Sequence, residues 1–323
     1  MNKTTLSILI GVASSLFLIG AITWIYPSTD DLWIENPFWN GLSDFYSQTN
    51  PTRVQNYDSF SVFNTTDSTL FIIGPYRDFT KNEADAISNY IKQGGTLILL
   101  DDYGTGNQLL EILDIDTRFT GDVLRDPVFR DKNSLMPLAS IHGVPKVDKI
   151  VLNIPTTLAF YQGIDFIGFS SSLSYTTQSL EVEPREFFQS PIFVRIDYGN
   201  GNIFLLSDSS IFINSMLTRG DNLSLLKYLA MGTIFIDEAH SMITHLTLIK
   251  NIIGVIFNKF EVYEVRYLIL TIFVIAIILF RPTLDPIVED EVKGLHKKHP
   301  EYDIELLDWL IKERRKARDK TVN

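Results

Sequence analysis

The most regular hydrophobic pattern in the chain lies between residues 67 and 102. Two short apolar runs, 68–73 and 96–100, stop at Gly, Pro or Asp, which is typical of buried strands. Between them, apolar residues recur at helical spacing, namely Ala84, Ile87, Tyr90 and Ile91. A helix between two buried strands predicts a parallel strand pair joined by a right-handed crossover.

Both ends of this helix carry signals. Thr80 is followed three residues later by Glu83, which is the spacing of a capping box. Gly94 and Gly95 follow the last apolar position, and glycine there commonly closes a helix. The helix is therefore expected to begin after Thr80 and to end before Gly95.

Shorter apolar runs continue the alternation of strands and helices, which predicts an α/β domain. Strands are expected at residues 53–57, 149–154, 164–169, 192–196, 203–206 and 234–236. Helices are expected at 107–113 and 223–231, the second capped by Asp221 or Asn222, and a short helix is expected near residues 40–45 with Ser43 as its candidate cap. Residues 199–202 (GNGN) predict a tight turn, while residues 114–147 form an insertion or an irregular β region.

Two long apolar runs flank this domain. Leu6–Ile25 carries no charge over roughly 20 residues, about the length that crosses a bilayer. A cleaved signal peptide is the rival interpretation, but the run is long for one and no A-x-A site follows it. The second run, 267–280, is unbroken over roughly 14 residues and ends at Arg281. Counted back to Tyr263, it reaches the minimum of about 17 residues for a span. We therefore expect an N-terminal transmembrane helix (1–27), a domain (28–262), a C-terminal transmembrane helix (263–281) and a tail (282–323).

Charge sets the expected orientation of these parts. Lys3 precedes the first apolar run, and Arg281 and a basic tail follow the second, so both termini are expected in the cytoplasm. The protein would then be a two-pass cell-membrane protein with an extracytoplasmic domain. Residues 28–262 hold 16 basic and 28 acidic residues, a net charge of −12. Such acidity argues against a nucleic-acid partner, because phosphate binding needs a basic face.

Three predicted strands end in acidic residues. In a parallel sheet the carboxyl ends of the strands line the ligand crevice, so these acids are candidates for a shared pocket. The candidates are the acids Asp101, Asp102, Asp208, Asp237 and Glu238, together with the nearby polar residues Asn214 and His240. Carboxylates there would suit a divalent cation or acid–base chemistry, but Asp also commonly ends strands and caps helices. For any single residue the structural role, ending a strand or capping a helix, is favoured over the chemical one. No metal or cofactor is therefore predicted.

Several motifs that suggest catalysis are incomplete. Residues 237–240 spell DEAH, yet no G-x-x-x-x-G-K-[ST] sequence is present to hold phosphates. Residues 207–210 (SDSS) lack the glycines of a nucleophile elbow. The loop 101–106 (DDYGTG) is only a partial dinucleotide fingerprint. The chain contains no cysteine, which excludes disulfides, thiolate metal sites and a cysteine nucleophile.

The motifs taken together resemble a known family. Residues 79–84 (FTKNEA) with 90–97 (YIKQGGTL) resemble the core of glutamine-amidotransferase-like domains. Residues 201–214 and 235–240 (FIDEAH) resemble later blocks of that group. With the flanking apolar runs, the pattern is similar to the membrane-anchored domain-of-unknown-function 4350 family, and more distantly to the GldG-like gliding-motility accessory domain. The resemblance implies a flavodoxin-like parallel sheet flanked by helices, and a MoxR-type AAA ATPase as an associated partner.

Two functions follow from these observations. The first is a non-catalytic, membrane-anchored binding or assembly module, because amidotransferases of this kind need the cysteine that the chain lacks. The second is a metal-dependent or acid–base hydrolase at the cell surface, which would need the candidate acids to converge within about 5 Å. The partners expected are the lipid bilayer and a membrane or cytoplasmic protein.

The tail carries a further amphipathic pattern. Ile304, Leu307, Leu310 and Ile311 share one helical face, and Trp309 lies beside it. A run of basic residues follows between Lys312 and Lys320. The tail is therefore expected to form a helix that lies on an anionic membrane surface or docks on a protein partner.

Overall fold

The computed structural model describes residues 26–57, 67–159, 165–178, 186–242, 244, 247–250 and 296–319, together with 11, 12, 14, 15 and 20. The chain divides into two compact units, Met1–Ala21 with Phe257–Asn323, and Ile22–Ile256. The second unit holds the α/β domain. Within the described part of the first unit, α9 spans Ile304–Asp319.

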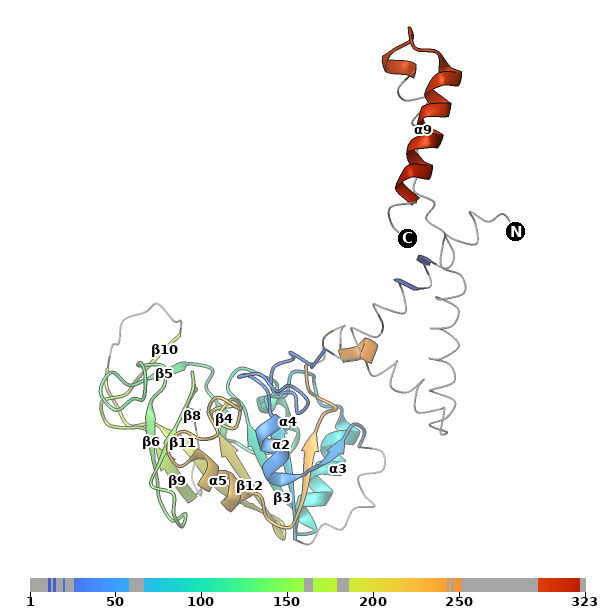
Figure 1. Ribbon diagram of the computed structural model, residues 1–323. Helices are drawn as coiled ribbons and strands as arrows, with labels where there is room; N and C mark the ends of the chain where they lie inside the picture. Colours follow the sequence, from blue (N-terminus) through green and yellow to red (C-terminus); the bar gives the residue numbers. More distant parts are fainter. Residues whose placement is uncertain are drawn as a thin grey trace. The chain divides into compact units, whose positions relative to one another are not determined.

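A nine-stranded mixed sheet forms the centre of the domain (Figure 1). Its strands, in spatial order, are β1 (Thr52–Val54), β13 (Thr233–Asp237), β2 (Ser68–Ile73), β3 (Thr96–Leu100), β12 (Gly201–Leu206), β11 (Pro191–Tyr198), β9 (Asp165–Phe169), β6 (Leu138–Ile141) and β7 (Lys149–Val151). The first five strands run parallel to one another, and the remaining four are antiparallel to their neighbours. The predicted parallel sheet is therefore present as one half of a larger mixed sheet.

Side chains of the parallel strands alternate between two cores, as a period of two requires. On β3, for example, Leu97 and Leu99 join one buried cluster, whereas Ile98 and Leu100 join the other. The first cluster includes residues of α3 (Lys81–Lys92) and α4 (Gly106–Ile112). The second includes residues of α2 (Ser43–Thr49) and α5 (Asn222–Leu229). Helices thus cover both faces of the sheet, which confirms the predicted α/β class.

The segment from β2 to β3 forms as its sequence predicts. The Thr80 side chain accepts from the Glu83 amide, and the Glu83 carboxylate accepts from the Thr80 amide at 2.8 Å, so the capping box is complete. Gly94 has a positive φ of 111° just beyond the helix. The parallel register aligns Leu70 with Leu97.

The predicted helix caps elsewhere are partly wrong. Ser43 is the first residue of α2, and the cap position belongs to Leu42. Asp221 holds the cap position of α5, but its carboxylate accepts from the amides of Asp148 and Lys149, both at 2.9 Å. These partners lie more than seventy residues away along the chain, so local spacing gives no sign of them.

The irregular region between α4 and β11 contributes short strands. It contains β4 (Arg118–Phe119), β5 (Val123–Arg125), β8 (Leu158–Ala159) and β10 (Tyr175–Thr177). These form two separate two-stranded ribbons, β4 with β8 and β5 with β10. Figure 1 shows the β5–β10 ribbon at the end of the domain opposite to α3. The predicted turn at residues 199–202 joins β11 to β12, with Gly199 at φ 66°.

Both predicted transmembrane helices fall largely outside the described residues. Only residues 11, 12, 14, 15 and 20 of the first apolar run are described, and none of the second. Among the residues that are described, no helix combines the length and the apolar character needed to span a bilayer. The membrane assignment therefore stays a prediction from sequence.

Candidate functional site

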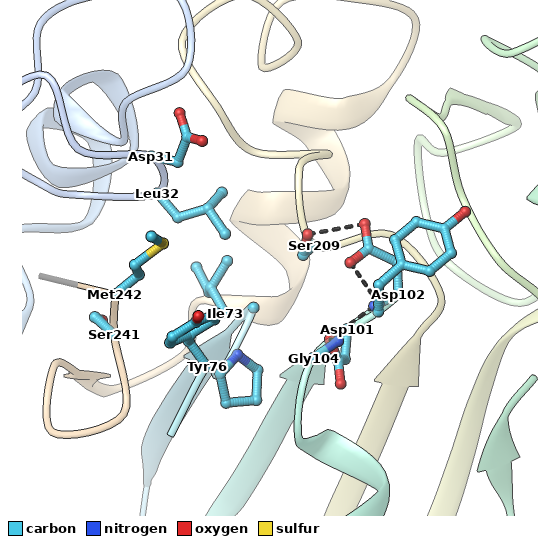
Figure 2. Close-up of a pocket in the computed structure, with 13 residues that line it drawn as sticks. Asp31, Leu32, Ile73, Tyr76, Asp101, Asp102, Gly104, Ser209, Ser241 and Met242 are labelled. Atoms are coloured by element: carbon cyan, nitrogen blue, oxygen red, sulfur yellow. Dashed lines mark hydrogen bonds between the residues drawn. The ribbon is translucent and has the colours of Figure 1, made fainter. Parts of the chain in front are cut away.

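A cleft of about 210 Å³ opens at the carboxyl ends of the parallel strands. Its walls come from the residues that follow β2, β3, β12 and β13, and from the segment before α2. In Figure 2 the side chains of Leu32 and Ile73 lie on its apolar side, with Asp102 and Ser209 across from them. This is the edge at which parallel sheets place ligand crevices.

Asp101 is buried in the wall of this cleft and holds the loop after β3. Its Oδ1 accepts from the amides of Asp102 and Gly104, both at 2.8 Å, and its Oδ2 accepts from the Gly106 amide at 2.7 Å. A Cβ at Gly106 would lie 2.5 Å from that Oδ2, so this close approach requires glycine. Burial raises the pKa of Asp101 to about 6 against these hydrogen bonds. The carboxylate thus fills the position where the loop's amides would otherwise face a ligand.

Asp102 and Asp208 lie next to each other, because β3 and β12 are adjacent strands. Asp102 accepts from the Ser209 hydroxyl at 3.0 Å (Figure 2). Asp208 is fully buried and accepts from the Asn153 amide at 2.7 Å and from the amide and hydroxyl of Ser210, both at 2.8 Å. Burial, with a contribution from the Asp102 charge, raises the pKa of Asp208 to about 7. Burial also raises the pKa of Asp102.

Asp237 and His240 form a second cluster at the end of β13. The His240 Nδ1 lies 3.1 Å from both carboxylate oxygens of Asp237, and its Nε2 lies 3.6 Å from Glu83 Oε2. The Tyr57 hydroxyl donates to Asp237 at 3.1 Å, and the Phe79 ring stacks on the imidazole with centroids 3.7 Å apart. The imidazole is 2% exposed, so this cluster packs the β13 end against the start of α3.

Glu238 turns to the edge strand rather than to the cleft. Its Oε1 lies 2.7 Å from the Nε of Arg53 in β1, and its Oε2 accepts a hydrogen bond from the Gln55 side-chain amide at 3.3 Å. Burial raises the pKa of Glu238 although the Arg53 guanidinium favours its charged form. The ion pair fixes the edge strand to the loop that follows β13.

Asn214 holds the segment before α2 in place. Its Oδ1 accepts from the Asp44 amide at 2.9 Å, and its Nδ2 donates to the carbonyls of Asn36 and Phe38 at 3.1 and 2.6 Å. The same nitrogen lies 3.1 Å from the Ser43 hydroxyl. Asn214 therefore has a structural role, because it binds backbone groups that lie 170 to 178 residues earlier in the chain.

The seven candidate residues thus form separate groups. Asp101, Asp102 and Asp208 come together, whereas Asp237, Glu238 and His240 lie beyond β2, because β2 separates β13 from β3 in the sheet. Two of the seven, Asp101 and Asp102, line the cleft. Across the residues that the structure describes, no group of three or more Asp, Glu or His side chains has the arrangement to hold a metal ion.

A family comparison identifies the domain. The family described as Domain of unknown function (DUF4350) matches residues 34–230. The chain belongs to this family. No curated protein matches it.

Among solved structures, three similar chains illustrate the range of likeness. The mmIFT52 N-terminal domain is 18% identical at a TM-score of 0.41, with 50% of this chain and 77% of that chain covered. Exo-beta-1,4-mannosidase Op5Man5 from Opitutaceae bacterium strain TAV5 is 12% identical at a TM-score of 0.30, with 50% and 24% covered. A cytoplasmic protein from Salmonella typhimurium LT2 is 12% identical at a TM-score of 0.35, with 55% and 74% covered. Likeness at this level carries no argument about function.

The cleft also contains residues that the sequence did not single out as candidates. Asp31 and Leu32 come from the linker before α2, while Tyr76, Ser209 and Met242 follow β2, β12 and β13. Ser209 and Tyr76 follow predicted strands, as Asp101 does, so their positions were detectable by the same rule. Asp31 was not, because the linker reaches the cleft only through tertiary contacts.

Proposed function

We propose that this protein is a membrane-anchored, non-catalytic binding module, and that the cleft beside Asp102 is its recognition site. One observation supports the proposal above others: the acids at the strand ends are engaged by donors of the same chain. Asp101 accepts three amides, and Asp208 accepts two amides and a hydroxyl. Side chains committed in this way stabilise loops and are not free to transfer protons to a substrate.

The membrane anchor and the partner in this proposal are predicted from the sequence. The two apolar runs would anchor the chain, and the positive-inside tendency would place the cleft outside the cytoplasm. A partner at the cleft would then be an extracytoplasmic or membrane protein. The MoxR-type AAA ATPase that the family resemblance implies would meet the cytoplasmic tail instead.

The hydrolase remains the alternative, and one pair of residues favours it. Asp102 and Ser209 both line the cleft and are hydrogen-bonded to each other at 3.0 Å. A carboxyl with a raised pKa beside a hydroxyl is a combination that acid–base chemistry uses. The better-matched pKa values belong to Asp101 and Asp208, which are 1% and 0% exposed. Asp208 is therefore out of reach of a substrate, and both carboxylate oxygens of Asp101 in the cleft wall are already occupied by amides.

Site-specific photo-crosslinking in native membranes tests the binding proposal. A photoreactive amino acid replaces Tyr76, which lines the cleft and is 63% exposed. The matched control replaces Tyr46, an exposed residue of α2 that does not line the cleft. We expect a discrete adduct with one protein from position 76 and none from position 46. The absence of any adduct at position 76, or identical adducts from both positions, would contradict the proposal.

A further inference from the structure

The charge of the cleft restricts what it can bind. Asp31, Asp101 and Asp102 lie in its walls, and the described residues that line it include no Lys, Arg or His. An anion entering the cleft would meet carboxylates without a compensating positive charge. The lining alone therefore disfavours phosphates and carboxylates and favours a positively charged group.

The usual anion site of such a sheet is also occupied by the chain itself. Loops between a parallel strand and the next helix bind anions through backbone amides. Here the amides of Asp102, Gly104 and Gly106 all donate to the Asp101 carboxylate, at 2.7 to 2.8 Å. The loop 101–106 resembles a dinucleotide-binding loop in sequence, but its donors are already used.

The remaining lining suits the apolar part of a ligand. Leu32, Ile73 and Met242 form an apolar side of the cleft in Figure 2. Tyr76 and Tyr103 are 63% and 51% exposed, and the Tyr103 hydroxyl is held by donation to the Ile154 carbonyl at 3.2 Å. Exposed aromatic faces attract cations, and the effect adds to that of a nearby carboxylate.

We propose that the cleft binds an organic ammonium ion carried on an apolar stem, with the chemistry of a lysine side chain. The ammonium group would lie near Asp102 and the tyrosine rings, and the stem would lie along Leu32, Ile73 and Met242. The inference rests on the proposed binding function, because it names the chemical class recognised at the same cleft. A lysine of a partner protein and a free amine share this chemistry.

Titration calorimetry on the purified full chain tests the inference with three probes whose α-amino and α-carboxyl groups are blocked. N-acetyl-lysine amide carries the ammonium and the stem, N-acetyl-norleucine amide carries the stem alone, and N-acetyl-glutamate amide carries a negative charge. We expect the lysine probe to bind at least about tenfold more tightly than the norleucine probe. The preference should weaken in high salt, because screening reduces the attraction. A lysine-containing pentapeptide with blocked ends separates the sources: tighter binding than the single residue indicates a protein ligand, and equal binding a small amine.

Two variants connect the preference to the cleft. Asp102→Asn keeps the shape of the side chain and should lower the affinity for the lysine probe about tenfold. Asp85→Asn removes an equal charge from an exposed position on α3 and should leave the affinity unchanged. Equal binding of the three probes, or an unchanged affinity in Asp102→Asn, would overturn the inference. A crosslinked partner at position 76 combined with such a result would leave the binding function intact and refute only the ligand class.

Discussion

At the scale of single residues, position after a strand does not determine what an acid does. Asp101, Asp208 and Asp237 all stand where a strand ends, and sequence reasoning treats them alike. Asp101 accepts amides of its own loop, Asp208 accepts the distant Asn153 amide, and Asp237 contacts an imidazole. The sequence predicts that these residues are close to the carboxyl edge. It does not predict their partners, because donors from other loops are fixed only by the tertiary fold.

Asp208→Asn is expected to change the pH dependence of stability. Burial raises the pKa of Asp208 to about 7, whereas an unfolded aspartate titrates near 4. Between these values the folded chain binds more protons than the unfolded chain, so this residue lowers stability as pH rises. Asparagine does not titrate. The difference in the free energy of unfolding, variant minus wild type, should therefore increase by on the order of 3 kcal/mol from pH 4.5 to pH 8.

Urea unfolding of both proteins across this pH range measures the difference. The asparagine amide would face one of the amide donors of Asn153 and Ser210, so the variant should be less stable than the wild type at low pH. That cost does not vary with pH and leaves the slope interpretable. Asp85→Asn serves as the control and should run parallel to the wild type. Parallel curves for Asp208→Asn would show that Asp208 does not titrate in this window.

At the scale of elements, local signals predicted what local contacts build. β2, α3 and β3 match the expected ranges closely, because capping and periodicity act over a few residues. In the antiparallel half of the sheet, the predicted strands at 149–154, 164–169 and 192–196 correspond to β7, β9 and β11, but β6 and the antiparallel order of these strands were not predicted. β6 pairs with β9, so that Ser140 lies opposite Phe169, and β6, β7 and β9 are only three to five residues long, which leaves little periodic signal in the sequence. The candidate residues were expected to share one pocket for the same reason: the strand order is not visible in the sequence. In the sheet, β2 separates β13 from β3, so the candidates after these two strands lie apart.

The tail helix offers a prediction at this scale. α9 spans Ile304–Asp319, and Ile304, Trp309 and Leu310 are 44%, 58% and 49% exposed on it. An apolar stripe followed by basic residues suits an anionic lipid surface, at about 1 kcal/mol per basic residue near it. A synthetic peptide of residues 303–320 should bind anionic vesicles in low salt and dissociate in high salt, as measured by Trp309 fluorescence.

The matched control is a peptide with Leu307 and Leu310 replaced by Ser. It keeps the charges, loses part of the stripe and should bind more weakly. Binding that persists in high salt would point to apolar docking instead, because salt screens charge attraction and not hydrophobic burial. A peptide that does not bind vesicles at low salt would favour a cytoplasmic protein partner for this helix.

At the scale of the whole molecule, the distribution of charge predicts where each part lies. Residues 28–262 carry a net charge of −12, while Lys3, Arg281 and the tail carry positive charge beside the apolar runs. An acidic domain is poorly suited to an anionic membrane surface, and basic flanks are retained in the cytoplasm. The acidic cleft belongs to the part of the chain that this distribution predicts to lie outside the cytoplasm.

Protease protection in intact cells tests this arrangement. With an epitope tag after Asn323, external protease should degrade residues 28–262 and leave the tag intact, because the positive-inside tendency keeps Lys3 and the basic tail in the cytoplasm. Permeabilised cells provide the control, since the tag should then be lost as well. A charge-reversed variant, with Arg281 and the basic tail residues changed to Glu, should shift a fraction of the molecules towards exposure of the tag. Loss of the tag in intact cells while the domain stays protected would show the opposite orientation, and it would move the cleft and its ligand to the cytoplasm.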